Sequence, residues 1–223
     1  MPIKIEHLSH VYQPGSPFQS DALQDIDFTI EDGELLALIG HTGSGKSTLA
    51  QHLNGLLTPT SGRVLVDGED INQKGANRRA LRQRVGLLFQ YAEYQLFEET
   101  VYKDIAFGPK NQGLTGDELT EIINELHQDG VTMVIISHNM DDVARIATRA
   151  AVLHKGRLAM LGTPREIFSR GDELAAMGLD VPQTVQLCQA LRAGGMDVPD
   201  CLTNEELCDA ICRALGKEAA AHA

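Results

Sequence analysis

Gly40-His41-Thr42-Gly43-Ser44-Gly45-Lys46-Ser47 is the stretch that decides the fold of this chain. It fits the pattern G-x-x-x-x-G-K-[ST], in which glycines let the backbone curl until successive N–H groups point at a phosphate chain. The lysine of the pattern reaches the β- and γ-phosphates, and the hydroxyl that follows it ligates Mg²⁺. A chance glycine-rich turn is the alternative, and the flanking segments decide between the two.

Both flanks of the octet have the sequence pattern that this motif requires, a strand before it and a helix after it. Residues 34–39 form a short apolar run of strand length. After the octet, leucines recur at helical spacing at Leu49, Leu53, Leu56 and Leu57. A helix that begins here adds the partial positive charge of its N-terminus to the amides of the turn. We therefore predict a strand, a glycine turn and a helix that bind a nucleoside triphosphate.

Composition limits the classes of partner. The chain has 223 residues, 43% of them hydrophobic, and a net charge of −12 from 31 acidic and 19 basic residues. No window is dense in Lys or Arg, so a nucleic-acid partner is not expected. Residues 1–30 lack the charge and hydropathy pattern of a signal peptide, and no apolar run is long enough to span a bilayer. We therefore expect any membrane role to be peripheral.

The four cysteines all lie in the last fifth of the chain, at Cys188, Cys201, Cys208 and Cys212. Their number and position indicate a reduced compartment. Cys208 and Cys212 are one helical turn apart and could present two thiolates to a metal. Two ligands alone make a poor zinc site. We expect small buried apolar side chains instead.

Periodicity predicts the other elements. Before the tail we expect an edge strand at 3–12, a strand at 22–30 ended by a hairpin signal at 31–33, a strand at 63–68, a surface helix within 70–84 and a buried strand at 85–90. Later we expect a hairpin about Lys155-Gly156 and a helix capped by Thr163 and Glu166, with Pro164 at its first position. Two or three short amphipathic helices follow within 172–216, and residues 218–223 are expected to fray.

The order of these segments resembles that of the ATP-binding cassette (ABC) transporter ATPases: Tyr12, the octet, Val85 to Gln90, then Ile135-Ile136-Ser137-His138. The stretches 95–111, 162–168 and 178–183 narrow the resemblance to the ATP-binding components of energy-coupling factor transporters. These import vitamins and, in related systems, cobalt or nickel. The resemblance implies an α/β P-loop fold with a parallel core sheet, an antiparallel N-terminal β-subdomain, a truncated helical subdomain and a C-terminal helical extension. It divides the chain into a nucleotide-binding domain at 1–161 and the extension at 162–223.

The resemblance also implies roles for individual residues. Tyr12 would stack on adenine, although an aromatic of an edge strand is often plain packing. Gln90 would bind Mg²⁺ or the attacking water, and His138 would contact the γ-phosphate and orient that water, although a lone His at a strand end is usually structural. ATP would be bound by Tyr12 and by the octet with the next residue, namely Gly40, His41, Thr42, Gly43, Ser44, Gly45, Lys46, Ser47 and Thr48, and Mg²⁺ by Ser47 and Gln90.

The implied setting is a membrane complex. Residues 91–111 would face a transmembrane scaffold (T) subunit, and a separate capture (S) subunit would choose the substrate. A second cassette, identical or not, would pair with this one on the cytoplasmic face of the cell membrane. The C-terminal extension helps such pairing in the family that the chain resembles.

Two motifs of that family do not occur in the sequence. There is no Leu-Ser-Gly-Gly-Gln signature loop and no Walker B strand ending in Asp-Glu, and the interval from Gln90 to His138 is too short for both. The match to the subfamily breaks near Leu119–Thr120, which indicates an internal in-frame deletion. We expect a domain of marginal stability in which ATP binding survives while hydrolysis falls by orders of magnitude.

The resulting functional hypothesis is an ATPase subunit that couples ATP binding and hydrolysis to uptake of a vitamin or transition-metal ion. Two alternatives stay open from the sequence. One is a nucleotide-binding or regulatory module that does not hydrolyse ATP, which the missing motifs favour. The other is the ATPase subunit of a different ABC importer.

Overall fold

The N-terminal part of the chain forms an antiparallel sheet in the computed structural model, which describes residues 1–87 and 130–216. Its strands are β1 (Ile3–Tyr12), β2 (Ser20–Ile30), β4 (Ser61–Val66) and β5 (Glu69–Asp70), in the order β2-β1-β4-β5. Residues 3–12 were expected at an edge, and that prediction is wrong. Ile3 pairs with Ile30 on one side and with Val66 on the other, so β1 is a central strand.

The strand before the glycine octet lies at the centre of a second sheet, in the order β6-β3-β7-β8. β3 (Leu35–Ile39) pairs in parallel with β6 (Met133–Ile136) and β7 (Arg149–His154), and β8 (Arg157–Gly162) runs antiparallel to β7. All five residues of β3 are buried, which explains their unbroken apolar run. The predicted strand at 34–39 and the hairpin about Lys155-Gly156 are confirmed.

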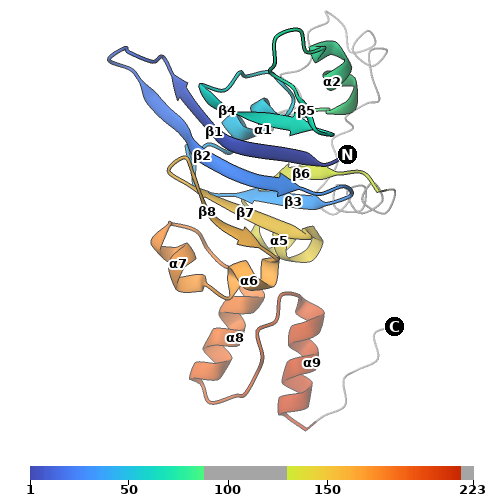
Figure 1. The fold of residues 1–223 in the computed structure, drawn as a ribbon. Coiled ribbons are helices and arrows are strands. Elements are labelled where there is room, and N and C mark those ends of the chain that lie inside the picture. Colours follow the sequence, from blue (N-terminus) through green and yellow to red (C-terminus); the bar gives the residue numbers. More distant parts are fainter. Residues whose placement is uncertain (88–129, 217–223) are drawn as a thin grey trace, which may run out of the picture.

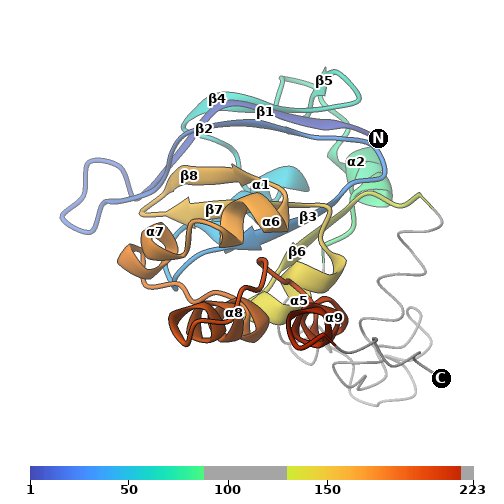
Figure 2. The ribbon, with the colours of Figure 1, turned by 90° about the horizontal axis from the view of Figure 1, so that it is seen from below.

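Side chains of β3 alternate between two cores. Leu36 and Leu38 pack with Leu49, Leu53 and the apolar side of the first sheet. Ala37 and Ile39 face the opposite way, toward the helices that cover the other side of the second sheet. Figures 1 and 2 show this layering, with the two sheets stacked and the C-terminal helices beneath the second one. The octet therefore begins where a strand buried on both faces ends.

The helices of the described residues are short. They are α1 (Lys46–Leu53), α2 (Arg78–Arg84), α5 (Met140–Ile146), α6 (Pro164–Phe168), α7 (Gly171–Ala176), α8 (Gln183–Ala193) and α9 (Asn204–Ala214). The capping box of Thr163 and Glu166 is present with Pro164 at the first helical position, as predicted. The tail beyond it contains three helices, in agreement with the two or three expected. In the described residues we find no helix long and apolar enough to cross a membrane.

Several expected boundaries differ from the structure. Residues 31–33 do not close a hairpin, because β2 and β3 belong to different sheets. The helix within 70–84 begins only after Asn77, whose side chain caps it. Residues 85–87 are not in a strand, and 88–90 lie outside the described residues, as do 91–111 and the proposed junction at 119–120.

The prediction of buried cysteines is correct for two of the four. Cys188 and Cys201 lie in the tail core with Leu207 and Ala210, whereas Cys208 is exposed and Cys212 is half-buried. Leu207 and Ala210 occupy the inner face of α9, so Cys208, which lies between them, turns outward. Within 1–87 and 130–216, no group of three His, Cys, Asp or Glu side chains could hold a metal ion.

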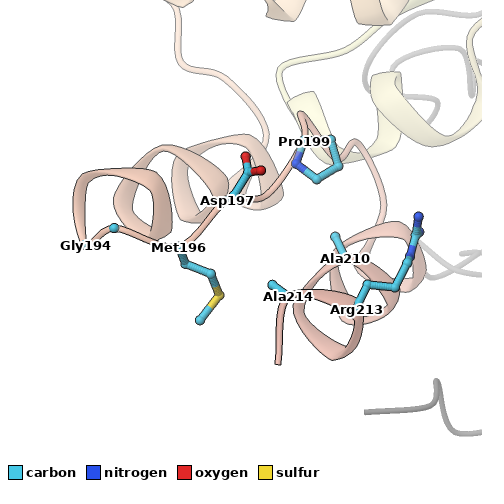
Figure 3. Close-up of a pocket in the computed structure, with 8 residues that line it drawn as sticks. Gly194, Met196, Asp197, Pro199, Ala210, Arg213 and Ala214 are labelled. Atoms are coloured by element: carbon cyan, nitrogen blue, oxygen red, sulfur yellow. The ribbon is translucent and has the colours of Figure 1, made fainter. Parts of the chain in front are cut away.

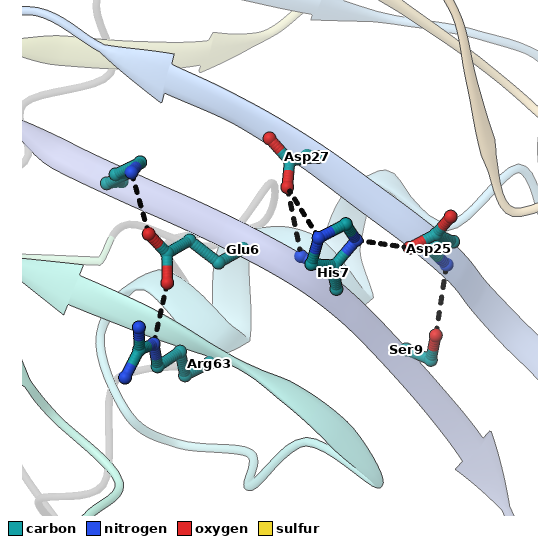
Figure 4. A network of polar contacts seen from close by, with 7 residues as sticks. Glu6, His7, Ser9, Asp25, Asp27 and Arg63 are labelled. Atoms are coloured by element: carbon teal, nitrogen blue, oxygen red, sulfur yellow. Dashed lines mark hydrogen bonds and ion pairs between the residues drawn. The ribbon is translucent and has the colours of Figure 1, made fainter.

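The outer face of the first sheet carries charged side chains in pairs (Figure 4). Glu6 contacts both Lys4 and Arg63, and the imidazole Nδ1 of His7 lies 2.9 Å from Asp25 Oδ1. The pairing of β1 with β2 is irregular here, and His7 and Asp25 both have positive φ. Because these groups are exposed, they contribute little to stability.

Candidate nucleotide-binding site

The glycine octet is folded as a tight turn that only glycine allows at two positions. Gly40 has φ +154°, and a Cβ there would lie 2.4 Å from the carbonyl oxygen of Leu153. Gly45 has φ +105°, and its Cβ would lie 2.6 Å from the carbonyl oxygen of Ala22. Neighbouring backbone thus approaches the turn from two sides, which leaves no room for side chains.

Backbone hydrogen bonds hold this turn closed. The N–H of Ser44 donates to the carbonyl of His41 at 3.1 Å, and the N–H of Gly156 donates to the carbonyl of Ser44 at 3.2 Å. The bond from the Leu49 N–H to the carbonyl of Gly45, at 2.8 Å, belongs to the first turn of α1. The octet is therefore a curled loop that leads into a helix N-terminus, the geometry that receives phosphate groups.

The lysine of the octet is folded into the loop. Its ammonium donates to the carbonyl of Gly40 at 2.6 Å and to that of His41 at 3.0 Å, and the residue is only 7% exposed. Burial lowers the pKa of Lys46. A cation that is poorly hydrated and held by two carbonyls is well placed to accept phosphate oxygens as partners.

Tyr12 lies at the end of β1, and the residue is 38% exposed. Its hydroxyl and the Thr48 Oγ1 are 3.3 Å apart, which joins the aromatic to the first turn of α1. Although β1 is central over Ile3–Ser9, at Tyr12 it pairs with β2 alone. Tyr12 therefore leaves part of its surface accessible beside the glycine turn.

Parallel pairing brings His138 to the same level as the turn. Leu38 of β3 is in register with Ile136 of β6, so Gly40 and His138 follow at the same carboxyl edge of the sheet. His138 is exposed and directly precedes Asn139, whose side chain caps α5. Gly40 and His138, which follow β3 and β6, both line a hollow of about 200 Å³. Its lining residues are Gly40, His41, Thr42, His138, Met140, Gly178, Leu179 and Asp180.

The third wall of this hollow comes from the tail, for which the resemblance implied a role in cassette pairing and none at this site. Residues 178–180 connect α7 to α8, and the Gln183 N–H donates to the Asp141 carboxylate at 3.0 Å. A Cβ on Gly178 would lie 3.5 Å from the imidazole of His41. The only sequence signal was the resemblance of 178–183 to a transporter subfamily, which did not indicate a position beside the octet.

Of the two predicted Mg²⁺ ligands, the structure describes Ser47 and not Gln90. Gln90, predicted to bind Mg²⁺ or water, lies outside the described residues. Ser47 and Thr48 lie in the first turn of α1 with the Ser47 hydroxyl exposed. A larger hollow of about 600 Å³ lies in the tail, near Met196, Asp197 and Arg213 (Figure 3), but it contains none of the predicted site residues.

A curled glycine turn between a buried parallel strand and a helix, with a buried lysine at the helix start, defines a P-loop nucleotide-binding domain. The model of the ABC transporter family matches residues 23–159 of the chain. The chain belongs to this family.

The relatives are similar along almost their whole length. The energy-coupling factor transporter ATP-binding protein EcfA2 of Symbiobacterium thermophilum is 42% identical, with 95% of this chain and 96% of the relative covered. That of Caldanaerobacter subterraneus is 39% identical, with 96% and 98% covered. Within the ABC family the chain therefore belongs to the energy-coupling factor ATP-binding proteins. These alignments extend over 275 and 280 residues, more than the 223 residues of this chain. The relatives therefore contain residues that have no counterpart here.

Solved structures agree with the fold. CbiO1 from Clostridium perfringens, described as part of the ABC transporter complex cbiONQ, has a TM-score of 0.63 at 25% identity and covers 85% of this chain and 98% of its own. The bacterial ABC transporter cassette MJ0796 has a TM-score of 0.60 at 19% identity, with 73% and 99% covered, and shows the fold alone. The predicted α/β P-loop class and the suspected family are confirmed.

Proposed function

We propose that this chain is the ATP-binding subunit of an energy-coupling factor importer, binding ATP at the turn of residues 40–48 and coupling that binding to uptake of a vitamin or transition-metal ion. The observation that carries the proposal is the curled octet with Lys46 held at its centre. The hydrogen bonds of Lys46 are to neutral carbonyls. Phosphate oxygens replace these carbonyls at a gain, because both partners of the new bond are charged.

The other residues take the roles that the resemblance implies, and the positions of Tyr12, Ser47 and His138 support them. The ring of Tyr12 offers a stacking face for adenine beside the phosphate turn. The Ser47 hydroxyl and the Gln90 amide are the proposed ligands of Mg²⁺, which would neutralise charge on the phosphates. His138 lines the hollow with His41 and Thr42, which supports its proposed contact with the terminal phosphate and a water molecule.

ATP hydrolysis by this chain is proposed to be severely weakened. The sequence has no Walker B Asp-Glu pair to hold Mg²⁺ through water and to polarise the attacking water. It also lacks the signature loop with which one cassette completes the site of its partner. The alignments that are longer than the chain support loss of an internal block. Among the described residues, β6 pairs with β3 on one side only. A further strand could pair with its other side.

The proposed assembly is a pair of cassettes on the cytoplasmic face of the cell membrane, bound to a T subunit and an S subunit. The names of the relatives and the cbiONQ complex of the structural neighbour support membership of a transporter complex. The chain thus binds the membrane peripherally, through its partners. The capture subunit decides which substrate is carried.

Nucleotide binding and turnover test these proposals separately. We expect purified protein to bind ATP with Mg²⁺ in a calorimetric titration and to show turnover orders of magnitude below that of a variant in which the missing block of a relative is inserted at 119–120. Binding without turnover, unchanged by the insertion or by a complete partner cassette, would favour a regulatory module. Co-purification with subunits other than T and S would favour a different importer.

A further inference from the structure

Two buried histidines lie directly behind Tyr12. His10 is on the same strand, two residues earlier, and its ring centroid is 4.5 Å from that of Tyr12 in an edge-to-face arrangement. His52 is on α1, and its ring centroid is 4.7 Å from that of His10, again edge to face. The three rings form a continuous row from the exposed aromatic to the phosphate-binding helix.

The same helix closes this row through Thr48. The Nδ1 of His52 lies 2.7 Å from the Thr48 carbonyl oxygen, while the Thr48 hydroxyl lies 3.3 Å from the hydroxyl of Tyr12. A carbonyl can only accept, so Nδ1 carries the hydrogen and the Nε2 of neutral His52 is a bare lone pair. Thr48 follows Ser47 in the first turn of α1, so the ring of Tyr12 is tied to the residues around the phosphates.

Packing alone does not explain why these two residues are histidines. His52 is fully buried and His10 is 8% exposed, and within the described part of the chain neither the Nδ1 of His10 nor the Nε2 of His52 makes a hydrogen bond, although the Thr58 carbonyl lies near enough to raise the pKa of His52. A buried polar atom without a partner is costly, and leucine or phenylalanine would fill the same space without that cost. What the imidazole of His52 adds over leucine or phenylalanine is a donor for the Thr48 carbonyl, and both histidines keep an aromatic ring in the edge-to-face row.

We propose that His10 and His52 are positioning residues for the nucleotide base, which hold the ring of Tyr12 at a fixed place relative to α1. Neither residue is proposed to touch the nucleotide. The inference rests on the proposed function, because it assumes that Tyr12 stacks on the base while residues 40–48 bind the phosphates. Its consequence is that the histidines contribute to binding of the base and not to binding of the phosphate chain.

The test compares ATP with inorganic tripolyphosphate, which has the phosphates and no base. We expect His52→Leu and His10→Leu to weaken ATP binding about three- to tenfold in calorimetric titrations and to leave tripolyphosphate binding unchanged. His52→Asn, which keeps a donor for the Thr48 carbonyl, is expected to restore most of the loss. In a Tyr12→Ala background, His10→Leu is expected to cause no further loss.

Other results would overturn the inference. Equal losses for ATP and tripolyphosphate would mean that the histidines support the whole loop, and no loss for either would mean that they only fill the core. If the loss of ATP affinity caused by His10→Leu adds to the loss caused by Tyr12→Ala, the histidine would act independently of the Tyr12 ring. If His52→Leu does not fold, His10→Leu gives the same comparison from β1. Wild-type protein that binds neither ligand would instead refute the proposed nucleotide site itself.

Discussion

The ammonium of Lys46 lies 2.6 Å from the carbonyl oxygen of Gly40, six residues earlier, and so closes the glycine turn upon itself. The loop is thereby held closed by its own buried lysine, whose ammonium donates to two carbonyls of the turn. Binding of a phosphate chain needs an exchange of partners at Lys46, and no rebuilding of the loop. This pre-organisation lowers the cost of binding.

Lys46→Ala should weaken ATP binding by at least about tenfold, and up to a hundredfold, because a charge-assisted contact to phosphate contributes about 1.5–3 kcal/mol. Lys74→Ala, in an exposed turn before α2, is the matched control and should bind as the wild type does. Calorimetric titration with ATP measures both. Unchanged affinity in Lys46→Ala would contradict the assignment of the octet as a phosphate cradle.

Gly45→Ala should destabilise the protein more than Gly43→Ala. Both glycines have positive φ, but a Cβ at Gly45 would lie 2.6 Å from the Ala22 carbonyl oxygen, whereas a Cβ at Gly43 would meet nothing within 4 Å. Strain in the left-handed region alone costs about 1–2 kcal/mol, so the excess loss at Gly45 measures the clash. Urea denaturation of both variants gives the comparison, and equal losses would show that the strand end at Ala22 can move.

Local patterns in the sequence were sufficient for the strand, turn and helix around the octet, because that geometry depends on neighbouring residues. The position of β1 was not predictable in the same way, since its second partner is β4, some fifty residues later. The hairpin expected at 31–33 was wrong for a related reason: turn residues say that the chain bends, but not which sheet the next strand joins.

The site also combines features set by neighbouring residues with features set by the packing of distant segments. Motif order placed His138 near the octet by resemblance, and the parallel register of β3 with β6 gives the physical reason. The wall formed by Leu179 and Asp180 depends on how the tail packs beneath the second sheet, which no local pattern encodes. The exposure of Cys208 likewise depends on which face of α9 meets the tail core.

Arg149→Met should destabilise the protein by about 3–5 kcal/mol, because it leaves a buried carboxylate without its partner. The Arg149 guanidinium lies 2.9 Å from the Glu34 carboxylate and also donates to the Thr29 carbonyl, so it joins β7 to residues next to β3 and in β2. Glu34 is only 7% exposed. The control is Arg170→Met, which breaks an exposed pair with Glu173 and should cost at most about 1 kcal/mol.

His52 should make the protein less stable in acid. Burial lowers its pKa below the ordinary 6.5, and the neighbouring His10 acts in the same direction, against the opposing effect of the Thr48 and Thr58 carbonyls. As the pH falls below about 6.5, the unfolded chain takes up a proton that the folded chain does not, so stability is lost down to the folded pKa. His52→Asn should lose less stability between pH 7 and 5 in urea titrations. Equal losses would show that the imidazole is charged in the fold.

Asp180→Asn should raise the affinity for ATP by about two- to threefold at low ionic strength. The Asp180 side chain is exposed at the hollow that His41, Thr42 and His138 line, so its carboxylate repels a phosphate chain bound there, although solvent screens the effect. The gain should vanish in high salt and should be absent for adenosine, which carries no charge. Asp172→Asn, an exposed acid on α7, serves as the control. A loss of affinity in Asp180→Asn would instead indicate that the carboxylate assists binding, through His138 or a bound cation.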